Sequence, residues 1–348
     1  MREGKKQERV VSLALAAALL LLVCPAGVQA QTRIRLATLL PQGSSQYHAL
    51  EEMGQQWKAS TGGSLTLTIY AGGTMGGEEE TIRRLRLGQL QAATVSAAGL
   101  SSIDPAVGAI EKIPMLYHSL EEMEYVCSKM RPDLEKHLEL KGFVVLSWTD
   151  AGWIHILSRQ PYTTPEEFKA KKSKVFTTSS DTDEASIINS LGFQAVPLEW
   201  SDVLISLQTG LVDTVPVTPF YALSSQFDLA AKNLLEVNYV PLVGATVMTK
   251  RAWDTLTPDQ QEKVLKAAAE AGEKIRAQSR AEGREAIAAM KKRGLQVRPV
   301  PPELEDDWRH FAENVYPKMR GKMIPADAFD KVLSLVAGYR AAQKTGHP

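Results

Sequence analysis

The stretch TPDQQEKVLKAAAEAGEKIRAQSRAEGREAIAAMKKRG, residues 257–294, predicts a single helix that is longer than one small domain is wide. Thr257 is a favourable N-cap, Pro258 suits the first turn, and Gln260 completes a capping box. Gly294 then ends the periodic pattern. A helix over residues 258–293 would be about 54 Å long at 1.5 Å per residue.

The apolar side of this helix is interrupted, which indicates that it packs on two separate cores. Apolar residues recur at helical spacing, fade between Gln278 and Glu285, and resume afterwards; they are Val264, Ala268, Ala271, Ile275, Ile287 and Met290. This pattern suits a helix that packs on one lobe at its start and on another at its end, with a solvent-exposed segment between them. A kink or break near Gly272 or Gly283 is the alternative that the sequence leaves open.

On either side of position 150, strand and helix patterns alternate, which is typical of α/β architecture. Before it, strands are expected at 33–38, 65–70 and 91–97, with helices at 46–59 and 78–87. After it, strands are expected at 143–148, 153–158, 174–177, 194–196 and 243–249, with helices at 165–168, 183–191 and 200–208. Residues 31–348 are enough for two domains of ~100–200 residues each.

The first thirty residues resemble a cleavable export signal. A basic segment with Arg2, Lys5, Lys6 and Arg9 precedes the apolar run 10–23, and Val28-Gln29-Ala30 gives a small-x-small cleavage pattern. The run is shorter than the roughly 20 residues of a transmembrane helix. Cys24 would suggest a lipid anchor, but Val23 precedes it where a small residue is expected, and Pro25 follows it. We expect soluble export to the periplasm.

Charge and cysteine content exclude several classes of function. The first thirty residues hold four basic and two acidic side chains, so the rest of the chain has 36 basic and 38 acidic ones. That balance disfavours nucleic-acid binding, which needs a clustered basic surface. Cys127 is the single cysteine after Cys24, so no disulfide or cysteine metal site can form within the exported chain. We expect Cys127 to be a small buried hydrophobe.

Six segments, in order, resemble the substrate-binding subunits of tripartite ATP-independent periplasmic (TRAP) transporters, the DctP-like family. They are Gly73–Glu78 with Gly88, Ile113–Tyr117, Thr164–Lys172, Leu191–Leu198, Ser206–Thr214 and Trp253–Leu256. Met75 replaces a leucine of the first motif. Each segment alone is a weak signal, whereas the ordered set covers nearly all of residues 33–293.

The resemblance implies the two-lobed α/β fold of periplasmic solute-binding proteins, with hinge crossovers and a long helix spanning both lobes. Lobe I would comprise 31–150 plus about 241–278, and lobe II would comprise 151–240 plus about 279–348. A small organic ligand would lie between the lobes, which would close around it and deliver it to TRAP-type membrane permease subunits. No cofactor or metal is expected, and we expect a monomer.

The two arginine positions that hold carboxylates in such proteins are changed. The resemblance places them at Lys174 and Ile154. One guanidinium, which could hold a carboxylate through two hydrogen bonds, is thus replaced by an ammonium, and the other by an aliphatic side chain. Lys174 is interpreted as a single ionic contact to the ligand, with a solvated lysine of a basic run as the alternative. A ligand with a monocarboxylate and one without any carboxylate both remain open.

Aromatic and hydroxyl side chains complete the candidate ligand site. The aromatic candidates are Trp148, Trp153, Phe176 and Phe220, which favour an apolar or aromatic ligand unless they are core residues. Thr218 and Gln226 lie in or after a proline-rich crossover and could bond a ligand or local backbone. Ser45 and Tyr47 follow the first strand, at the end of an α/β sheet where ligands bind.

Two rival functions remain open. An exported hydrolase lacks G-x-S-x-G, H-E-x-x-H and Walker motifs, and His155 is more simply a packed histidine than a catalytic base. A ligand-presenting sensor for a receptor kinase could use the same fold, and no residue separates it from a transport protein. We interpret the chain as a binding protein and not an enzyme.

Overall fold

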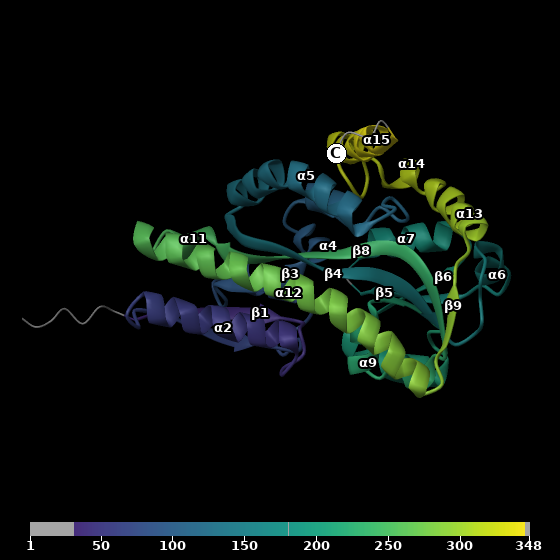
Figure 1. Ribbon diagram of the computed structural model, residues 1–348, viewed down its shortest axis with the longest axis horizontal. Helices are drawn as coiled ribbons and strands as arrows, with labels where there is room; N and C mark the ends of the chain where they lie inside the picture. The colour runs from purple at the N-terminus through teal and green to yellow at the C-terminus, as the bar shows by residue number, and fades with distance from the viewer. Residues whose placement is uncertain (1–30, 180, 345–348) are drawn as a thin grey trace, which may run out of the picture.

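The computed structural model describes residues 31–179 and 181–344 (Figure 1). The predicted export signal, residues 1–30 with Cys24, lies outside this part of the chain. A nine-stranded sheet has the order β2-β1-β3-β8-β4-β7-β5-β6, with β9 paired to β8. The strands are β1 Thr32–Thr38, β2 Leu65–Tyr70, β3 Ala92–Ser96, β4 Phe143–Ser158, β5 Lys174–Thr178, β6 Gln194–Leu198, β7 Thr214–Val217, β8 Asn233–Thr249 and β9 Gln296–Pro299.

Helices cover this sheet and connect its parallel strands. The longer helices are α2 Ser45–Ser60, α3 Glu78–Arg86, α5 Leu120–Leu140, α7 Thr182–Ser190, α12 Pro258–Lys292, α13 Pro302–Glu313 and α15 Ala326–Lys344. The shorter ones are α4 Ala97–Leu100, η1 Pro105–Ile110, α6 Pro165–Ala170, η2 Trp200–Asp202, α8 Val203–Thr209, α9 Pro219–Ser224, α10 Phe227–Ala230, α11 Lys250–Trp253 and α14 Tyr316–Met319. Among the described residues, no helix is long and apolar enough to cross a membrane.

Two long antiparallel strands, β4 and β8, join the two parts of the sheet. The β8 end near Thr249 pairs with β3, which continues to β1 and β2, whereas the β4 end near Ser158 pairs with β7, which continues to β5 and β6. Their register is irregular between Asp150 and Trp153. The predicted two-lobed α/β fold with extended crossovers is therefore confirmed.

The helix α12 is continuous and packs on both lobes, as the interrupted apolar pattern predicts. Thr257 Oγ1 accepts a hydrogen bond from Gln260 N (3.2 Å), and Gln260 Oε1 accepts one from Thr257 N (2.9 Å), so the capping box forms. Residues from Val264 to Ile275 join the core of α2 and β1, whereas Met290 joins the core beneath β5 and β7. In Figure 1, α12 runs diagonally across both parts of the sheet.

Gly272 is a packing residue in this helix. A Cβ atom at Gly272 would lie 3.0 Å from the backbone oxygen of Trp148, whereas one at Gly283 would meet nothing within 4 Å. Thr149 Oγ1 also donates a hydrogen bond to the Gly272 carbonyl (3.0 Å). The glycine therefore lets α12 lie directly against β4 just before the crossover.

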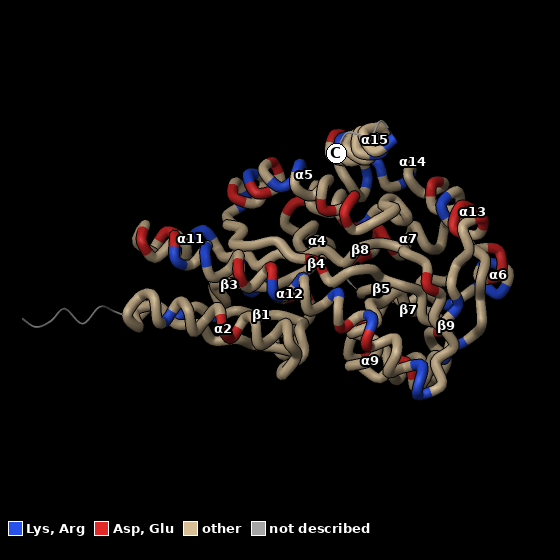
Figure 2. The backbone as a smooth tube through the Cα atoms, in the orientation of Figure 1, with Lys and Arg blue, Asp and Glu red and all other residues tan. Residues whose placement is uncertain are grey.

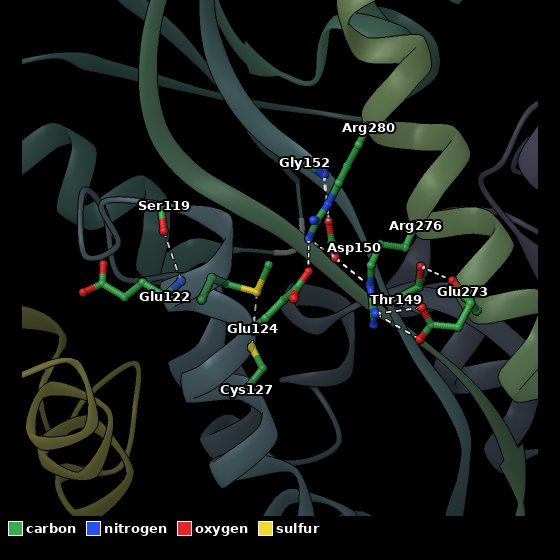
Figure 3. Close-up of polar contacts among 12 residues, drawn as sticks. Ser119, Glu122, Glu124, Cys127, Thr149, Asp150, Gly152, Glu273, Arg276 and Arg280 are labelled. Atoms are coloured by element: carbon green, nitrogen blue, oxygen red, sulfur yellow. Dashed lines mark hydrogen bonds and ion pairs between the residues drawn. The ribbon is translucent and has the colours of Figure 1, made fainter. Parts of the chain in front are cut away.

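An ionic cluster fixes α12 to that crossover (Figure 3). Asp150, with 3% of its side chain exposed, accepts hydrogen bonds from Arg276 Nε (3.1 Å) and from Arg280 Nε and a terminal nitrogen (2.9 Å each). Arg280 also donates to Glu124 of α5 (2.5 Å). Since charged, bidentate contacts are strong and directional, the cluster holds β4 in one position on the helix.

The C-terminal segment extends over both parts of the molecule. Trp308 of α13 packs with Phe168 of α6, whereas Phe329 and Val332 of α15 join the core that contains α5. The predicted lobe boundaries, 31–150 plus about 241–278 and 151–240 plus about 279–348, stay a prediction. The contact of α15 with α5 places the last helix beside lobe I, whereas the predicted boundaries assign its residues to lobe II.

Cys127 is buried in α5, in the core of the first lobe. Its sulfur lies 3.5 Å from the Met123 sulfur. Burial raises the pKa of the Cys127 thiol to about 12, which keeps the thiol protonated at neutral pH. The prediction of a small buried hydrophobe at this position is confirmed.

Candidate functional site

A cavity of about 890 Å³ lies between the two parts of the sheet. On one side its lining includes the end of β3 at Ser96, the start of α3 at Glu78 and Lys112 after η1. On the other side it includes the end of β5 at Thr178 and the start of α7 near Asp181. Both sides thus present the carboxyl end of a strand and the N-terminus of a helix, the usual position of a ligand in α/β sheets.

Glu78 is fixed in the wall by the turn that begins α4. Its carboxylate accepts hydrogen bonds from Ser96 N (2.6 Å) and Ser96 Oγ (2.5 Å). A Cβ atom at Gly99 would lie 2.4 Å from this carboxylate, so glycine leaves the space that Glu78 occupies. Burial raises the pKa of Glu78 even though the bonds from Ser96 lower it.

One ion pair connects the two sides of the cavity. Lys112 Nζ donates a hydrogen bond to Asp181 Oδ2 (2.5 Å), and only 15% and 17% of these two side chains are exposed. Asp181 is also the N-cap of α7 and accepts a bond from Glu184 N (2.9 Å). Asp181 therefore links Lys112 on one side of the cavity to the N-terminus of α7 on the other.

Two further carboxyl groups lie close to Lys112. Glu111 is 5% exposed and accepts a hydrogen bond from Ala98 N (3.2 Å); burial, with the Glu78 charge, raises its pKa well above the usual range. Burial, with the Asp181 charge, raises the pKa of Glu184 to about 7. Figure 2 shows acidic positions in the segments around α4 and α7. Carboxyl groups thus predominate in the charged part of the cavity.

The lining also includes an apolar and aromatic surface. Phe176 and Trp200 line the cavity with their ring centroids 4.6 Å apart, and Tyr221 packs edge-on against Trp200 at 5.1 Å. Ile154 of β4 and Pro216 of β7 extend this surface. The cavity thus combines charged groups from both sides with an apolar and aromatic surface.

The structure brings only one of the nine predicted ligand contacts, Phe176, to the cavity lining. Lys174 lies at the start of β5, where its ammonium donates to the Gly210 carbonyl (3.0 Å) and its backbone N donates to Asp213 Oδ1 (3.0 Å). Val175 is the first residue of β5 in the lining. A contact between Lys174 and a ligand stays a prediction.

The other aromatic candidates lie outside the lining. Trp148 is 7% exposed in the first-lobe core and donates from Nε1 to Glu135 (2.8 Å). Trp153 packs partly buried against the same core. Phe220 is half-buried in α9. Their positions are typical of structural aromatic residues, and their predicted role at the ligand is untested.

The polar candidates are dispersed. Thr218 is buried at the N-cap position of α9 without a side-chain cap bond, and Gln226 is exposed with a positive φ of 59°. Tyr47 lines a separate shallow pocket beside Glu51. Ser45 Oγ is buried and has no hydrogen-bond partner among the described residues. The prediction that these four side chains contact a ligand likewise remains untested.

His155 is packed and does not face the cavity. It is 7% exposed, and its Nδ1 lies 2.9 Å from the Val237 carbonyl oxygen. Burial lowers its pKa, which favours the neutral ring. Within residues 31–179 and 181–344, no group of three or more His, Cys, Asp and Glu side chains could hold a metal ion.

The sequence of residues 36–322 matches the family model of the bacterial extracellular solute-binding proteins, family 7 (DctP). The chain belongs to this family. The predicted relationship to TRAP-type DctP-like binding proteins is therefore confirmed. Family membership and the fold describe a binding protein, and the cavity lies where its two lobes meet.

Known relatives support the same fold. The C4-dicarboxylate-binding periplasmic protein DctP of Rhodobacter capsulatus is 25% identical over 274 residues, covering 77% of this chain and 80% of the relative. A TRAP periplasmic solute-binding protein from Sulfitobacter sp. NAS-14.1, solved with bound β-D-galacturonate, has a TM-score of 0.79 at 24% identity and covers 89% of this chain and 100% of its own. A sugar acid binding protein from Advenella mimigardefordensis, solved with galactonate, has a TM-score of 0.82 at 20% identity, covering 89% and 99%.

Proposed function

We propose that this chain is the extracytoplasmic binding subunit of a TRAP-type transporter. It captures one small organic molecule in the cavity between its lobes and delivers it to membrane permease subunits. The observation that carries this proposal is the cavity of about 890 Å³, lined from both lobes of a family 7 solute-binding fold. Residues 1–30 direct the protein to the periplasm, and the exported protein is a monomer.

The mechanism is closure about the two crossover strands. Ligand capture requires the lobes to separate, and the hinge lies where β4 is irregular between Asp150 and Trp153. The pair between Lys112 and Asp181 then stabilises the closed form from both sides of the cavity. Closure buries the ligand without any chemical step, so the protein acts as a carrier and not as an enzyme.

The ligand has an apolar or aromatic body. Ile154, Phe176 and Trp200 all line the cavity. The ammonium of Lys174 donates to the Gly210 carbonyl, and Lys174 lies outside the cavity lining, which disfavours a contact with a ligand carboxylate. These features disfavour the sugar acids and dicarboxylates that the relatives are named for, and they also disfavour a simple monocarboxylate.

Native mass spectrometry of the exported protein tests this proposal. The protein is incubated with a cell extract freed of macromolecules, and the bound molecules are released and identified. We expect one small organic molecule per chain, and we expect Ile154→Trp, which fills the cavity, to lose it while keeping its circular dichroism spectrum. A wild-type protein that retains no small molecule from such extracts would contradict the proposal.

A further inference from the structure

The charges that line the cavity are unbalanced. Eight lining residues carry carboxyl groups and four carry a positive charge. The acidic set is Glu78, Glu79, Glu80, Glu111, Asp181, Asp183, Glu184 and Glu199, and the basic set is Arg83, Arg86, Lys112 and Lys322. An anionic ligand would enter a region of its own charge, which is unfavourable at short range.

The positive groups of this set are already engaged or exposed. Arg83 pairs with Glu80 through Nε (2.6 Å), and Arg86 donates to the Ser102 carbonyl (3.0 Å). Lys112 is paired with Asp181, and Lys322 is exposed. Of the two guanidinium groups in the described lining, Arg83 already holds Glu80 through two parallel bonds, and Arg86 is exposed and donates to the Ser102 carbonyl.

The carboxyl groups around Lys112 are less well compensated. Glu78 accepts two bonds from Ser96, Glu111 accepts bonds from the backbone N–H groups of Ala98 and Ala97, and no side chain among the described residues donates to the Glu184 carboxylate. The raised pKa values of all three reflect burial and, for Glu111 and Glu184, a neighbouring carboxylate. An incoming cation would relieve this unfavourable arrangement.

A hydroxyl group and aromatic rings in the same cavity add independent observations. Thr177 lines the cavity, is 1% exposed, and has an Oγ1 without a hydrogen-bond partner among the described residues. That oxygen could accept a hydrogen bond from an ammonium group. Phe176, Trp200 and Tyr239 also line the cavity, and aromatic faces attract cations when water is excluded.

We propose that the ligand carries a positively charged nitrogen, which binds among Glu111, Glu184 and the aromatic side chains while its apolar body lies along Phe176 and Trp200. This inference rests on the proposed binding function and names the chemical class of the ligand. The charged nitrogen is a primary ammonium or a quaternary ammonium. The carboxylates and rings of the cavity suit both, whereas a hydrogen bond to Thr177 requires an N–H group.

A series of probes that share one aromatic body and differ in charge tests the inference by isothermal titration calorimetry on the exported protein. The probes are 2-phenylethylamine, its N,N,N-trimethyl derivative, 3-phenylpropionate and 3-phenylpropanol, which keep one aromatic body and change the charge. We expect at least one cation to bind with a Kd at least about tenfold lower than that of the carboxylate. A preference for the primary amine would identify an N–H contact, and a preference for the trimethyl form would identify the aromatic rings.

Two variants separate a ligand contact from a structural role. Glu184→Gln should weaken cation binding about tenfold or more and raise the melting temperature of the ligand-free protein, because it removes a poorly compensated charge. Glu262→Gln, an exposed glutamate of α12 with the same change in net charge, should alter neither.

Two results would overturn the inference. If the carboxylate binds as tightly as the cations, the binding function stands and the cationic ligand is wrong. If no cation binds, the cationic ligand is again wrong, and native mass spectrometry decides the binding function separately.

Discussion

Arg280 of α12 holds Asp150 of β4 through two parallel hydrogen bonds, one from Nε to Oδ1 and one from a terminal nitrogen to Oδ2, each 2.9 Å long. Asp150 is the last regular residue of β4 before the crossover, and Arg276 from the preceding helical turn binds the same carboxylate. Because α12 packs on both lobes, this contact joins the helix that spans the lobes to the strand that crosses between them.

Asp150→Asn should therefore destabilise the protein. The substitution keeps the shape of the side chain but leaves two partly buried arginines facing a neutral amide, and we expect a loss of about 2–3 kcal/mol in the free energy of unfolding. Urea unfolding followed by circular dichroism measures it. Glu273→Gln is the matched control. Glu273 is a 70% exposed partner of Arg276, so its substitution should change the free energy of unfolding by less than about 1 kcal/mol. Equal losses in both variants would contradict the account.

Gly272→Ala and Gly283→Ala should have opposite effects although both lie in α12. At Gly272 the new methyl group would lie 3.0 Å from the Trp148 carbonyl oxygen. The helix would have to move away from β4, which should lower the free energy of unfolding by about 1–3 kcal/mol. At Gly283 the space is open, and the better helix propensity of alanine should stabilise by about 0.5–1 kcal/mol. Thermal unfolding of the two variants measures the difference, and a stabilised Gly272→Ala protein would refute the close packing.

Lys112→Met should favour the open form of the ligand-free protein. It removes the one ion pair seen between Lys112 and Asp181, a charge-assisted bond whose loss should shift the closed-to-open ratio by about tenfold. Small-angle X-ray scattering should record a larger radius of gyration. Lys331→Met, which removes an exposed pair with Asp133, should leave the scattering unchanged. A compact Lys112→Met protein would mean that closure does not depend on this pair.

The stability of the ligand-free protein should fall as the pH rises from 5 to 8. The pKa of Glu184 is about 7 in the folded protein against an ordinary value of 4.5, so its stabilising contribution is complete below pH 4.5 and lost as the pH rises through 7. The raised pKa values of Glu78 and Glu111 act in the same direction. Melting temperatures across this range measure the effect, and Glu184→Gln should flatten the curve while Glu262→Gln keeps it. A curve that rises with pH would contradict the buried acidic cluster.

The fold was predictable because its signals are local or periodic. The ends of α12 follow from the capping box at Thr257 and Gln260 and from Gly294, and its two cores follow from apolar residues spaced 3.6 apart. The sequence could not decide whether Gly272 breaks the helix, because the answer depends on the distance to Trp148, over a hundred residues away.

The candidate site was largely missed, for a physical reason. Acidic residues at helix starts are expected for any helix, so the Glu78 and Glu184 positions gave no separate signal, although both line the cavity. Lys112 and Asp181 are 69 positions apart and meet only through folding. Of the predicted ligand contacts, only Phe176 lies in the cavity lining, whereas Lys174 lies just before the lining begins, and both contacts stay predictions.

Hydrogen–deuterium exchange measured by mass spectrometry tests the central claim most directly, that one solute lies between the lobes and contacts both. The protein is compared as purified with its bound solute and after the solute has been removed by unfolding and refolding. The account predicts that the solute protects 96–100 of the first lobe and 174–178 of the second lobe together. Protection confined to one lobe, or to a surface away from the cavity, would contradict it.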